Sequence, residues 1–294
     1  MSDKDAARRR GSEAEENQIA ALPSAVLAKK RFGQHFLTDQ GVIRRIIRAF
    51  GPRAGETVIE IGPGRGALTA QLLDAAGRLV AVEFDRDLVP LLRERFGSLR
   101  NFTLIEGDAL AVDFCAAIRP AAQARVIANL PYNIATAILQ RLIEQRHCLT
   151  EMVLMLQREV VERLTAPPAS RARGFISVFT QAYCVAGALF DVPPGAFRPA
   201  PKVWSTVVRL RVRPRLAVDV SDEALLWRAV SAGFAQRRKT LLNNLRHAPH
   251  DLRARIEEAG GTNRLLEAAH IAPARRAETL TLDEWARLAN ALAL

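Results

Sequence analysis

The sequence predicts an α/β fold in which a parallel sheet is followed by a small all-helical domain. A β-branched run at 58–61 breaks into three glycines within 62–66 and resumes as an amphipathic helical pattern. A second buried-looking strand at 79–82 ends in Glu83, and from Ser221 onward the chain has helical periodicity without a strand pattern. Strands that alternate with helices are typical of a parallel sheet, so a strand–helix–strand unit should form the centre of the first domain.

The glycine-rich turn of this unit predicts a cofactor site. Because they lack Cβ atoms, Gly62 and Gly64 let the backbone turn sharply and approach a ligand closely. Glu83 lies 21 residues beyond Gly62, at a strand end where a carboxylate accepts hydrogen bonds from ribose hydroxyls. The spacing G-x-G-x-G differs from the dinucleotide pattern G-x-G-x-x-G, which favours S-adenosylmethionine (SAM) over NAD. A glycine-rich turn that binds no ligand is the alternative.

Length and charge bound the number of domains and the kind of partner. The 294 residues, 49% of them hydrophobic, suffice for one large core and a smaller second one. We expect a disordered tail over 1–28, a catalytic domain over 29–215 and a helical domain over 216–294. The formal net charge of +11 indicates a polyanionic partner, for which nucleic acid is the best candidate. A generally basic proteome would give the same charge without such a partner.

The three cysteines, Cys115, Cys148 and Cys184, are odd in number and far apart. We therefore expect neither a disulfide framework nor a C-x-x-C metal site, and this usage fits a reducing, cytoplasmic location. His247 and His250 lie close together, but no cysteine or acidic pair in ligand spacing accompanies them, so no metal is expected. No apolar run approaches membrane-spanning length, and the polar N-terminal segment has no hydrophobic leader.

Polar residues also follow later strands. Asp108 comes after one expected strand, and Asn129 ends the next, at 125–129. Ligands of open α/β sheets gather at the carboxyl ends of the strands, so both residues should share a crevice with Gly62 and Glu83. Asp108 would there accept a hydrogen bond from an adenine amine, although an acidic residue at a strand end is also a common helix N-cap.

The stretch Asn129-Leu130-Pro131-Tyr132 suits a nucleobase amine, whose delocalised lone pair is a weak nucleophile. The side-chain carbonyl of Asn129 and the backbone carbonyl of Leu130 can accept the two amine hydrogens and favour a tetrahedral nitrogen facing a methyl sulfonium. Pro131 stiffens the turn, and Tyr132 offers a stacking face. Because an amide cannot remove a proton, the proton would leave to water after methyl transfer. A strand that merely ends in a proline turn is the alternative.

The remaining elements are expected in a simple order: a helix at 39–50, a strand from 152 that runs into a helix, a buried strand over 175–185 and an alternating strand over 204–212. The proline-rich loop at 192–203 should be rigid and stay out of the sheet. It would hold Phe197 against a flipped base, unless it is a plain connector.

Clusters of cations point to the same kind of partner as the net charge. One cluster lies beside aromatic residues before the first helix, two cations flank the ring at 197, and a cationic amphipathic helix is expected over 234–246. Charge runs are often only solvated faces. The candidate RNA phosphate contacts are Lys29, Lys30, Arg31, Arg198, Lys202, Arg237, Arg238 and Lys239.

Seven segments carry a resemblance to a known family: Phe-Gly-Gln-His-Phe-Leu at 32–37, Glu-Ile-Gly-Pro-Gly-Arg-Gly at 60–66, Glu83, Gly-Asp at 107–108, Asn-Leu-Pro-Tyr-Asn at 129–133, the loop 197–203 and Gln-Arg-Arg-Lys-Thr at 236–240. From about Lys30 to Leu292 the chain resembles the KsgA/RsmA family of ribosomal RNA adenine dimethyltransferases. The resemblance implies a Rossmann-like SAM-dependent methyltransferase sheet with a small all-α C-terminal domain that binds RNA. It also implies conversion of two adjacent adenines in the 3′-terminal hairpin loop of 16S rRNA to N6,N6-dimethyladenine, on the immature small (30S) subunit during ribosome biogenesis.

The resemblance also assigns roles by position. The implied catalytic residues are Asn129, Leu130, Pro131, Tyr132 and Phe197, the last stacking on the adenine. The implied cofactor contacts are His35, Leu37, Gly62, Gly64, Glu83, Asp108 and Asn129. Many relatives have Asn where this chain has His35, and the tail before Lys29 is longer than is usual for the family.

Two other functions stay open. Methyltransferases that modify large-subunit RNA and confer macrolide resistance share the cofactor motifs and a similar Asn-x-Pro-aromatic element, but the segment 236–240 and the loop 197–203 argue against them. A non-catalytic assembly or transcription factor on the same fold is the second alternative, and the intact glycine turn and strand-end residues count against it. The compact pattern favours a monomer.

Overall fold

The computed structural model describes residues 28–29 and 32–293. Within this part of the chain, seven strands form a sheet in the order β4-β3-β2-β5-β6-β9-β7. Strands β4, β3, β2, β5 and β6 pair in parallel, and β9 runs antiparallel between β6 and β7. The strands are β2 (Thr57–Ile61), β3 (Arg78–Glu83), β4 (Phe102–Glu106), β5 (Ala124–Asn129), β6 (Leu149–Gln157), β7 (Cys184–Val192) and β9 (Ser205–Val212).

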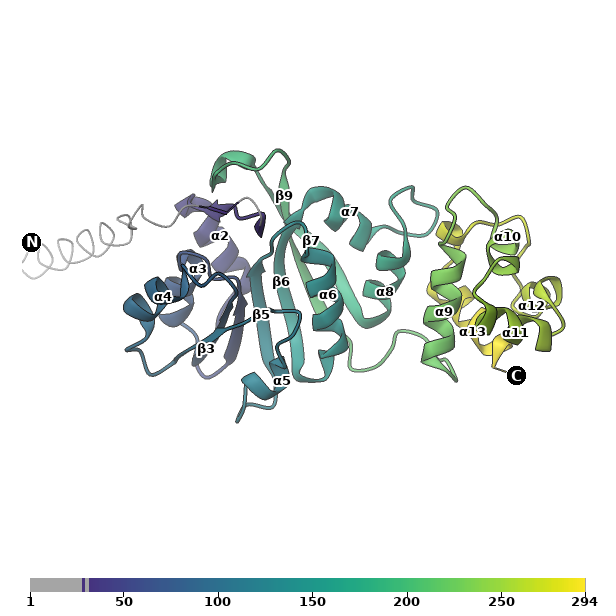
Figure 1. The fold of residues 1–294 in the computed structure, drawn as a ribbon, viewed down its shortest axis with the longest axis horizontal. Coiled ribbons are helices and arrows are strands. Elements are labelled where there is room, and N and C mark those ends of the chain that lie inside the picture. The colour runs from purple at the N-terminus through teal and green to yellow at the C-terminus, as the bar shows by residue number, and fades with distance from the viewer. Residues whose placement is uncertain (1–27, 30–31, 294) are drawn as a thin grey trace, which may run out of the picture.

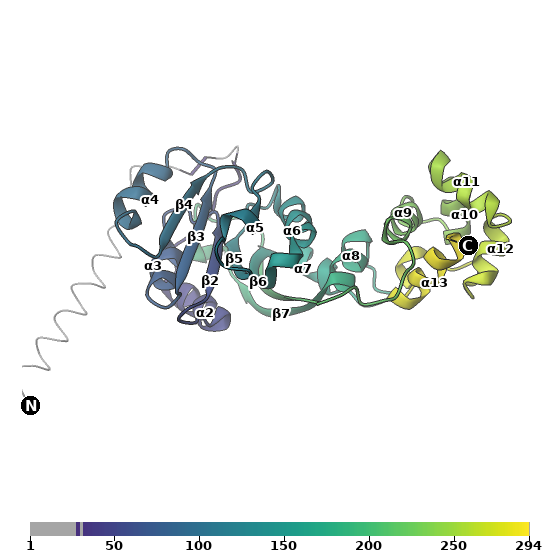
Figure 2. The ribbon, with the colours of Figure 1, turned by 90° about the horizontal axis from the view of Figure 1, so that it is seen from below.

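The strand order reverses at β2, and this reversal positions the site (Figures 1 and 2). Strands β3 and β4 lie on one side of β2, whereas β5 and β6 lie on the other, as Figure 2 shows. A reversal of this kind leaves a crevice at the carboxyl ends of the two central strands, where open α/β sheets bind ligands. The helices around the sheet are α2 (Gln40–Phe50), α3 (Ala67–Leu73), α4 (Val89–Phe96), α5 (Phe114–Ala117), α6 (Ala135–Glu144), α7 (Arg158–Thr165) and α8 (Phe175–Tyr183), with a short 3₁₀ turn η2 (Arg146–Cys148).

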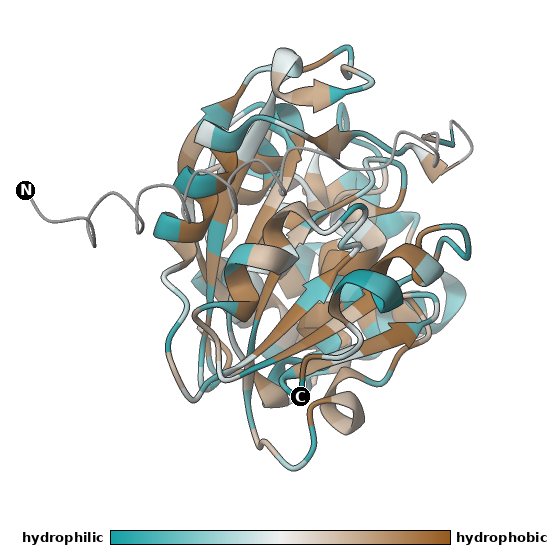
Figure 3. Ribbon diagram, turned by 90° about the vertical axis from the view of Figure 1, so that its left-hand side faces the viewer, coloured by the Kyte–Doolittle hydropathy of each residue, from teal (hydrophilic) through white to brown (hydrophobic). Residues whose placement is uncertain are grey.

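Apolar clusters fill both faces of the sheet. On β5, Val126 and Ala128 point into a cluster with α5 and α6, whereas Ile127 between them points into a cluster with α2 and α3. All three side chains are buried, as expected for a parallel strand that is covered on both faces. Figure 3 shows the hydrophobic residues concentrated along these central strands. The apolar clusters on the two faces of the sheet therefore fix the positions of the polar residues at the strand ends.

The C-terminal helices pack around a further apolar cluster, far from α3 and α4 (Figures 1 and 2). Trp285 is fully buried there. The connection to the sheet is aromatic: Trp227 lies 5.0 Å from Phe179 between ring centroids and donates a 2.7 Å hydrogen bond from Nε1 to the Tyr183 hydroxyl. The expected domain boundary at 215 stays a prediction. The helices are α9 (Glu223–Gly233), α10 (Leu241–Arg246), α11 (His250–Glu258), α12 (Thr262–Ala268) and α13 (Leu282–Leu292).

Most of the expected elements are confirmed. Helix α2 begins after Asp39, whose side chain accepts a 2.9 Å hydrogen bond from the Val42 N–H. Strand β6 runs directly into α7, and β9 is the strand expected over 204–212, although its first four residues are all buried instead of alternating. The proline-rich loop stays out of the large sheet, because its β8 (Phe197–Arg198) pairs with β1 (Phe36–Leu37) separately. Over the described residues, no helix is long and apolar enough to cross a bilayer.

The strand expected over 175–185 is wrong. The chain forms helix α8 up to Tyr183 and then enters β7. Apolar side chains at 175, 178, 179 and 182 follow the helical spacing i, i+3, i+4, i+7, and they divide between the sheet cluster and the C-terminal cluster. This period was overlooked because the segment is rich in β-branched and aromatic residues, which are also typical of strands.

The cationic helix expected over 234–246 is also wrong. Helix α9 ends at Gly233, an irregular segment follows, and α10 begins after Thr240, whose hydroxyl caps the new helix. The Asn244 side chain donates a hydrogen bond back to the Gly233 carbonyl, which fixes the break between the helices. The cations at 237–239 therefore lie on a loop.

The expected absence of a disulfide is a further error. Cys115 and Cys148 are disulfide-bonded, with their Cα atoms 5.5 Å apart. They are separated by 33 residues, so their spacing gives no sign of contact. The side chain of Gln145 brings the two segments together, because it accepts a 2.7 Å hydrogen bond from the Phe114 N–H beside α5 while its backbone leads into η2.

Candidate active site

A cavity of about 300 Å³ opens at the carboxyl ends of β2, β3 and β5, where the strand order reverses. The structure brings every predicted cofactor contact to its wall, namely His35, Leu37, Gly62, Gly64, Glu83, Asp108 and Asn129. Leu130, Pro131 and Tyr132 line the same cavity. Residues that are almost a hundred positions apart in the sequence thus share one site, as the strand-end argument predicts.

The glycine turn after β2 gives the cavity room for a ligand. Gly62 and Gly64 have backbone φ angles of +66° and +60°, which residues that carry a Cβ atom rarely adopt. A Cβ at Gly62 would meet nothing within 4 Å, so the backbone borders open space there. At Gly64 a Cβ would lie 3.3 Å from the ring of Phe36. The first glycine therefore lets a ligand approach the backbone, and the second allows the turn to pack on β1.

Glu83 holds its carboxylate at the cavity by accepting backbone hydrogen bonds. Oε2 accepts from the Gly64 N–H at 3.1 Å, and Oε1 accepts from the Asp85 N–H at 2.8 Å. Burial raises the pKa of Glu83, and these two donors oppose the rise. The carboxylate is thus fixed in direction and retains lone pairs for ligand hydroxyls. This geometry suits the predicted ribose contact.

Asp85 forms a network that the sequence analysis missed. Its buried carboxylate pairs with the Lys29 ammonium and accepts a 2.7 Å hydrogen bond from Gln34 Nε2, and Asp87 lies 2.6 Å from the same ammonium. Burial acts to raise the pKa of Asp85, but the hydrogen bonds from Lys29 and Gln34 hold it below its usual value. The network ties the segment before β1 to the end of β3. Its only sequence signal is an acidic residue two positions after Glu83.

The predicted contact of Lys29 with RNA phosphate stays a prediction. Its ammonium pairs with two carboxylates, which leaves it little net charge for a phosphate, and its side chain is 23% exposed. The hydrogen bond to Asp85 raises the pKa of Lys29, so the pair stays ionised. Lys30 and Arg31, the other cations of this cluster, lie outside the described residues.

Glu60 is a second carboxyl group that the sequence analysis did not single out. It is almost fully buried at the cavity and accepts a 2.7 Å hydrogen bond from the Thr69 hydroxyl. Burial raises the pKa of Glu60 to about 8, helped by repulsion from Glu83. At neutral pH the Glu60 carboxyl is mostly protonated and uncharged. This wall of the cavity therefore carries one negative charge fewer than it would with Glu60 ionised.

Asp108 lies at the cavity and is not a helix N-cap, because Asp113 caps α5, while its contact with an adenine amine stays a prediction. It lines the cavity, and its Oδ1 accepts a 2.9 Å hydrogen bond from the Leu110 N–H. The exposed ring of Phe84 lines the same cavity, edge-to-face with Phe32 at 5.4 Å between centroids. Phe84 was missed because an exposed aromatic residue next to a motif gives no periodic signal, whereas Phe32 was expected only as part of the basic cluster before the first helix. They are the apolar surfaces that this part of the cavity offers to a planar ligand.

Asn129 ends β5 with its amide held in place. Its Nδ2 donates a 3.2 Å hydrogen bond to the His35 carbonyl, which leaves the side-chain oxygen as the acceptor of the amide. The Tyr132 hydroxyl hydrogen-bonds Ser205 Oγ at 2.7 Å, and the Tyr132 ring stacks on His35 at 5.6 Å between centroids. The Leu130 N–H donates a 3.2 Å hydrogen bond to the Met155 carbonyl of β6. The acceptors expected to hold an amine thus stand on a fixed turn.

Phe197 requires a correction. It was predicted to stack on the target adenine, but its ring is fully buried in the cluster with α2 and α3 and does not line the cavity. Leu37 is its partner across the β1–β8 pair, and strand alternation sends the next residue, Arg198, to the surface. The prediction that the loop stays out of the large sheet is confirmed, whereas the direction of the ring depends on the pairing with β1, which a motif does not contain.

The other predicted RNA contacts are exposed side chains. Arg198 and Lys202 lie on the proline-rich loop, and the remaining three lie on the loop between α9 and α10. The Arg237 guanidinium donates a hydrogen bond to the carbonyl of Arg171, which joins the loop between α9 and α10 to the segment between α7 and α8. Arg173 is instead buried and donates hydrogen bonds to the Ala166 carbonyl and to Gln181, so its role is structural.

Known proteins resemble this chain over most of its length. A profile for the family "Ribosomal RNA adenine dimethylase" matches residues 25–293. A ribosomal RNA small subunit methyltransferase A from Chromohalobacter salexigens is 47% identical over 275 residues, which cover 92% of this chain and 93% of the relative. The protein of the same name from Pseudomonas aeruginosa is 45% identical over 266 residues, covering 90% and 95%.

Two solved structures share the architecture. The 23S rRNA methyltransferase ErmE superposes with a TM-score of 0.65 at 25% identity, covering 88% of this chain and all of that one. A dimethyladenosine transferase from Plasmodium falciparum gives a TM-score of 0.72 at 22% identity, covering 86% and 96%. Both likenesses agree with the Rossmann-like sheet and helical C-terminal part described above. The chain belongs to the ribosomal RNA adenine dimethylase family.

Proposed function

We propose that this chain uses SAM to dimethylate the N6 amines of two adjacent adenines in the 3′-terminal hairpin loop of 16S rRNA, on the immature small subunit during ribosome biogenesis. The proposal is carried by one observation: the turn from Asn129 to Tyr132 shares a cavity with the glycine turn and Glu83. Methyl transfer to a base amine requires that one cavity hold both the amine and the methyl donor. The turn at Asn129 would hold the amine, and the glycine turn with Glu83 would hold the nucleoside part of the donor. The family relation supplies the class of substrate.

The cavity fits SAM on two grounds. Gly62 leaves open space beside the backbone, and Glu83 presents a buried carboxylate with lone pairs for ribose hydroxyls. The rings of Phe32 and Phe84 and the carboxyl of Asp108 would hold the adenine portion. When bound, SAM supplies an electrophilic methyl group on sulfur. We assign this group of residues, with His35 and Leu37 closing the cavity, to cofactor binding.

The residues at the end of β5 act on the target amine. The Asn129 side-chain oxygen and the Leu130 carbonyl accept its two hydrogens, which draws the nitrogen toward a tetrahedral shape and localises its lone pair. Pro131 and Tyr132 keep this turn in place, and the hydrogen bond from Tyr132 to Ser205 anchors it to β9. As the new N–C bond forms, the nitrogen gains positive charge, and its proton then leaves to water.

The cations of the two exposed loops, together with Lys30 and Arg31, would bind the RNA backbone. Arg198 lies on β8, which pairs with the cavity-lining strand β1, whereas 237–239 extend the basic surface to the helical part. This arrangement supports recognition of a folded RNA by shape and charge, by a cytoplasmic monomer whose residues 29–215 catalyse and whose residues 216–294 bind RNA.

The deciding experiment is transfer of labelled methyl from SAM to small subunits that lack the modification, with large subunits and naked RNA in parallel. We expect dimethyladenosine with small subunits alone. Label on large subunits would favour the resistance-type enzyme, an alternative that the likeness to ErmE keeps in view. Tight binding to small subunits without label would favour a non-catalytic assembly factor.

A further inference from the structure

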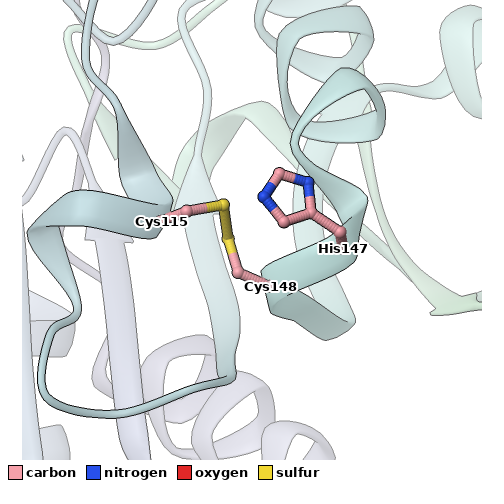
Figure 4. A group of neighbouring side chains, drawn as sticks. All are labelled: Cys115, His147 and Cys148. Atoms are coloured by element: carbon pink, nitrogen blue, oxygen red, sulfur yellow. A yellow bond between two sulfur atoms is a disulfide. The ribbon is translucent and has the colours of Figure 1, made fainter.

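Cys115, His147 and Cys148 form a group of potential metal ligands outside the cofactor cavity. One ligand atom from each residue lies within 4.8 Å of the other two, and none of the three residues lines the cavity. Figure 4 shows the His147 ring beside the two sulfur atoms. Cys115 lies on α5, whereas the other two lie on η2, so the fold rather than a local sequence motif brings the group together.

The support of this group is rigid. Gln145 accepts a hydrogen bond from the Phe114 N–H at 2.7 Å and donates one to the Val112 carbonyl at 2.9 Å, which clamps the start of α5 against η2. The Gln145 carbonyl oxygen lies 3.3 Å from the Cys148 sulfur and 3.6 Å from the Cys115 sulfur. The Gln145 carbonyl thus lies close to both sulfurs, and a ligand atom of His147 lies within 4.8 Å of each of them.

Access to the group comes from one side. Cys148 is 4% exposed and Cys115 is half-buried, whereas His147 lies at the surface. An ion from solvent would meet the imidazole first and the thiols behind it. A partly buried position with an open side is typical of metal sites that keep one coordination position for water.

We propose that Cys115, Cys148 and His147 bind a divalent ion of the Zn²⁺ type when the two cysteines are in the dithiol form. Zn²⁺ prefers thiolate and imidazole ligands and accepts three protein ligands with a water in the fourth position. Binding releases the two thiol protons to solvent, and the two thiolates neutralise the charge of the ion. The disulfide and the ion exclude each other, because a thiol reductant must first supply two electrons and two protons to the disulfide.

The site lies next to the connection between the sheet and the C-terminal helices. Arg146, on the same turn η2, lies 4.1 Å above the Tyr183 ring and pairs with Glu223 of α9 at 3.8 Å. An ion held by Cys115, His147 and Cys148 therefore links the turn that carries this contact to α5 when the disulfide is absent. We expect Zn²⁺ to raise the melting temperature of the reduced chain and to leave that of the oxidised chain unchanged.

The test uses the full chain after reduction, with the reductant removed, and Co²⁺ as a spectroscopic probe. We expect one equivalent of Co²⁺ to bind with sulfur-to-cobalt charge-transfer absorption, and Zn²⁺ to displace it. The oxidised chain should give neither signal. Absence of charge-transfer absorption in the reduced chain would overturn the proposal.

Variants locate the ligands. Cys148→Ser should abolish the charge-transfer absorption, and His147→Ala should keep part of it while weakening Zn²⁺ binding by more than the roughly 10- to 100-fold typical of losing an outer-shell partner. Cys184→Ala, at the third and buried cysteine, and His250→Ala, at an exposed histidine, are matched controls that should bind as the parent does. Equal binding by the parent and Cys148→Ser would also overturn the proposal. Should Cys148→Ser not fold, comparison of the reduced and oxidised parent decides.

Discussion

The cofactor cavity and the cationic loop at 237–239 are both marked by short motifs, but the motifs are informative to different degrees. At the cavity, the predicted residues are strand ends and glycines, and the structure brings all of them to one wall. At the loop, the cations are exposed, and the helix expected to carry them is broken between Gly233 and Thr240. Positions fixed by a parallel sheet follow from a motif, whereas exposed side chains depend on contacts made elsewhere in the chain.

The same contrast divides the cavity from the loop beside it. Asn129 ends a central strand, and its amide is fixed by the His35 carbonyl. Phe197 lies on a two-residue strand whose partner decides which way the ring points, and that pairing turns it into the core. We therefore expect substitutions at the sheet edge to have large effects confined to one step, and substitutions on the loops to have smaller effects on RNA affinity.

The largest effect should come from Asn129→Ala. Removal of one acceptor that acts on the reacting amine should lower the rate of methyl transfer at saturating SAM and small subunit about 10²- to 10³-fold, by analogy with the removal of one oxyanion-hole donor. SAM affinity, measured by calorimetry, should fall far less, because other wall residues hold the cofactor. Equal losses in rate and affinity would remove Asn129 from its proposed role.

Asn133→Ala is the matched control for this change. Asn133 lines the same cavity four residues farther on but does not end a strand. It should retain most of the transfer rate. A loss as large as that of Asn129→Ala would mean that the whole turn, rather than one acceptor, is sensitive to substitution.

Glu83→Gln should have the next largest effect, on binding rather than on rate. The amide keeps one acceptor but sets its NH₂ group against a backbone N–H of Gly64 or Asp85, so SAM affinity should fall about 10- to 100-fold, or about 1.5–3 kcal/mol. Glu106→Gln is the control, because Glu106 pairs with Glu83 in strand register but is an exposed surface carboxylate. Unchanged SAM affinity in Glu83→Gln would rule out the ribose contact.

The features of the fold and the site that could be predicted from the sequence are the local ones. The central strand–helix–strand unit, the glycine turn and the strand-end residues were predictable, because apolar runs and short spacings are local properties. The ion pair of Lys29 with Asp85 and the disulfide between Cys115 and Cys148 join segments that are 56 and 33 residues apart, and no local pattern encodes them. Helix α8 was missed for another reason, since its β-branched and aromatic residues are also typical of a strand.

A third prediction concerns pH and the buried Glu60. Its pKa rises from 4.5 to about 8 on folding, so the folded chain holds a proton that the unfolded chain loses as pH rises. The free energy of unfolding should therefore fall with rising pH between these values and level off above pH 8, by about 2 kcal/mol from pH 6 to pH 8. Glu60→Gln should remove this dependence, as followed by urea unfolding at several pH values. An identical slope in the variant would place the titration elsewhere.

The smallest effect should come from the exposed loop. Replacing Arg237, Arg238 and Lys239 together with Ala should weaken binding to small subunits about tenfold at moderate salt and reduce the slope of log affinity against log salt by up to about 2–3. For every phosphate that the variant no longer neutralises, binding releases one counterion fewer. The slope therefore measures how many phosphates these three side chains neutralise, whereas the affinity alone does not.

The control for this triple variant is an equal loss of charge on the helices of the same part of the chain, by Arg253→Ala, Arg255→Ala and Arg264→Ala. These arginines are exposed like those of the loop, but they lie on α11 and α12. If both variants lower the slope equally, net charge alone attracts the RNA. If only the loop variant does so, the cations at 237–239 contact phosphate directly, and a motif that failed to predict the local structure would still have marked the correct surface.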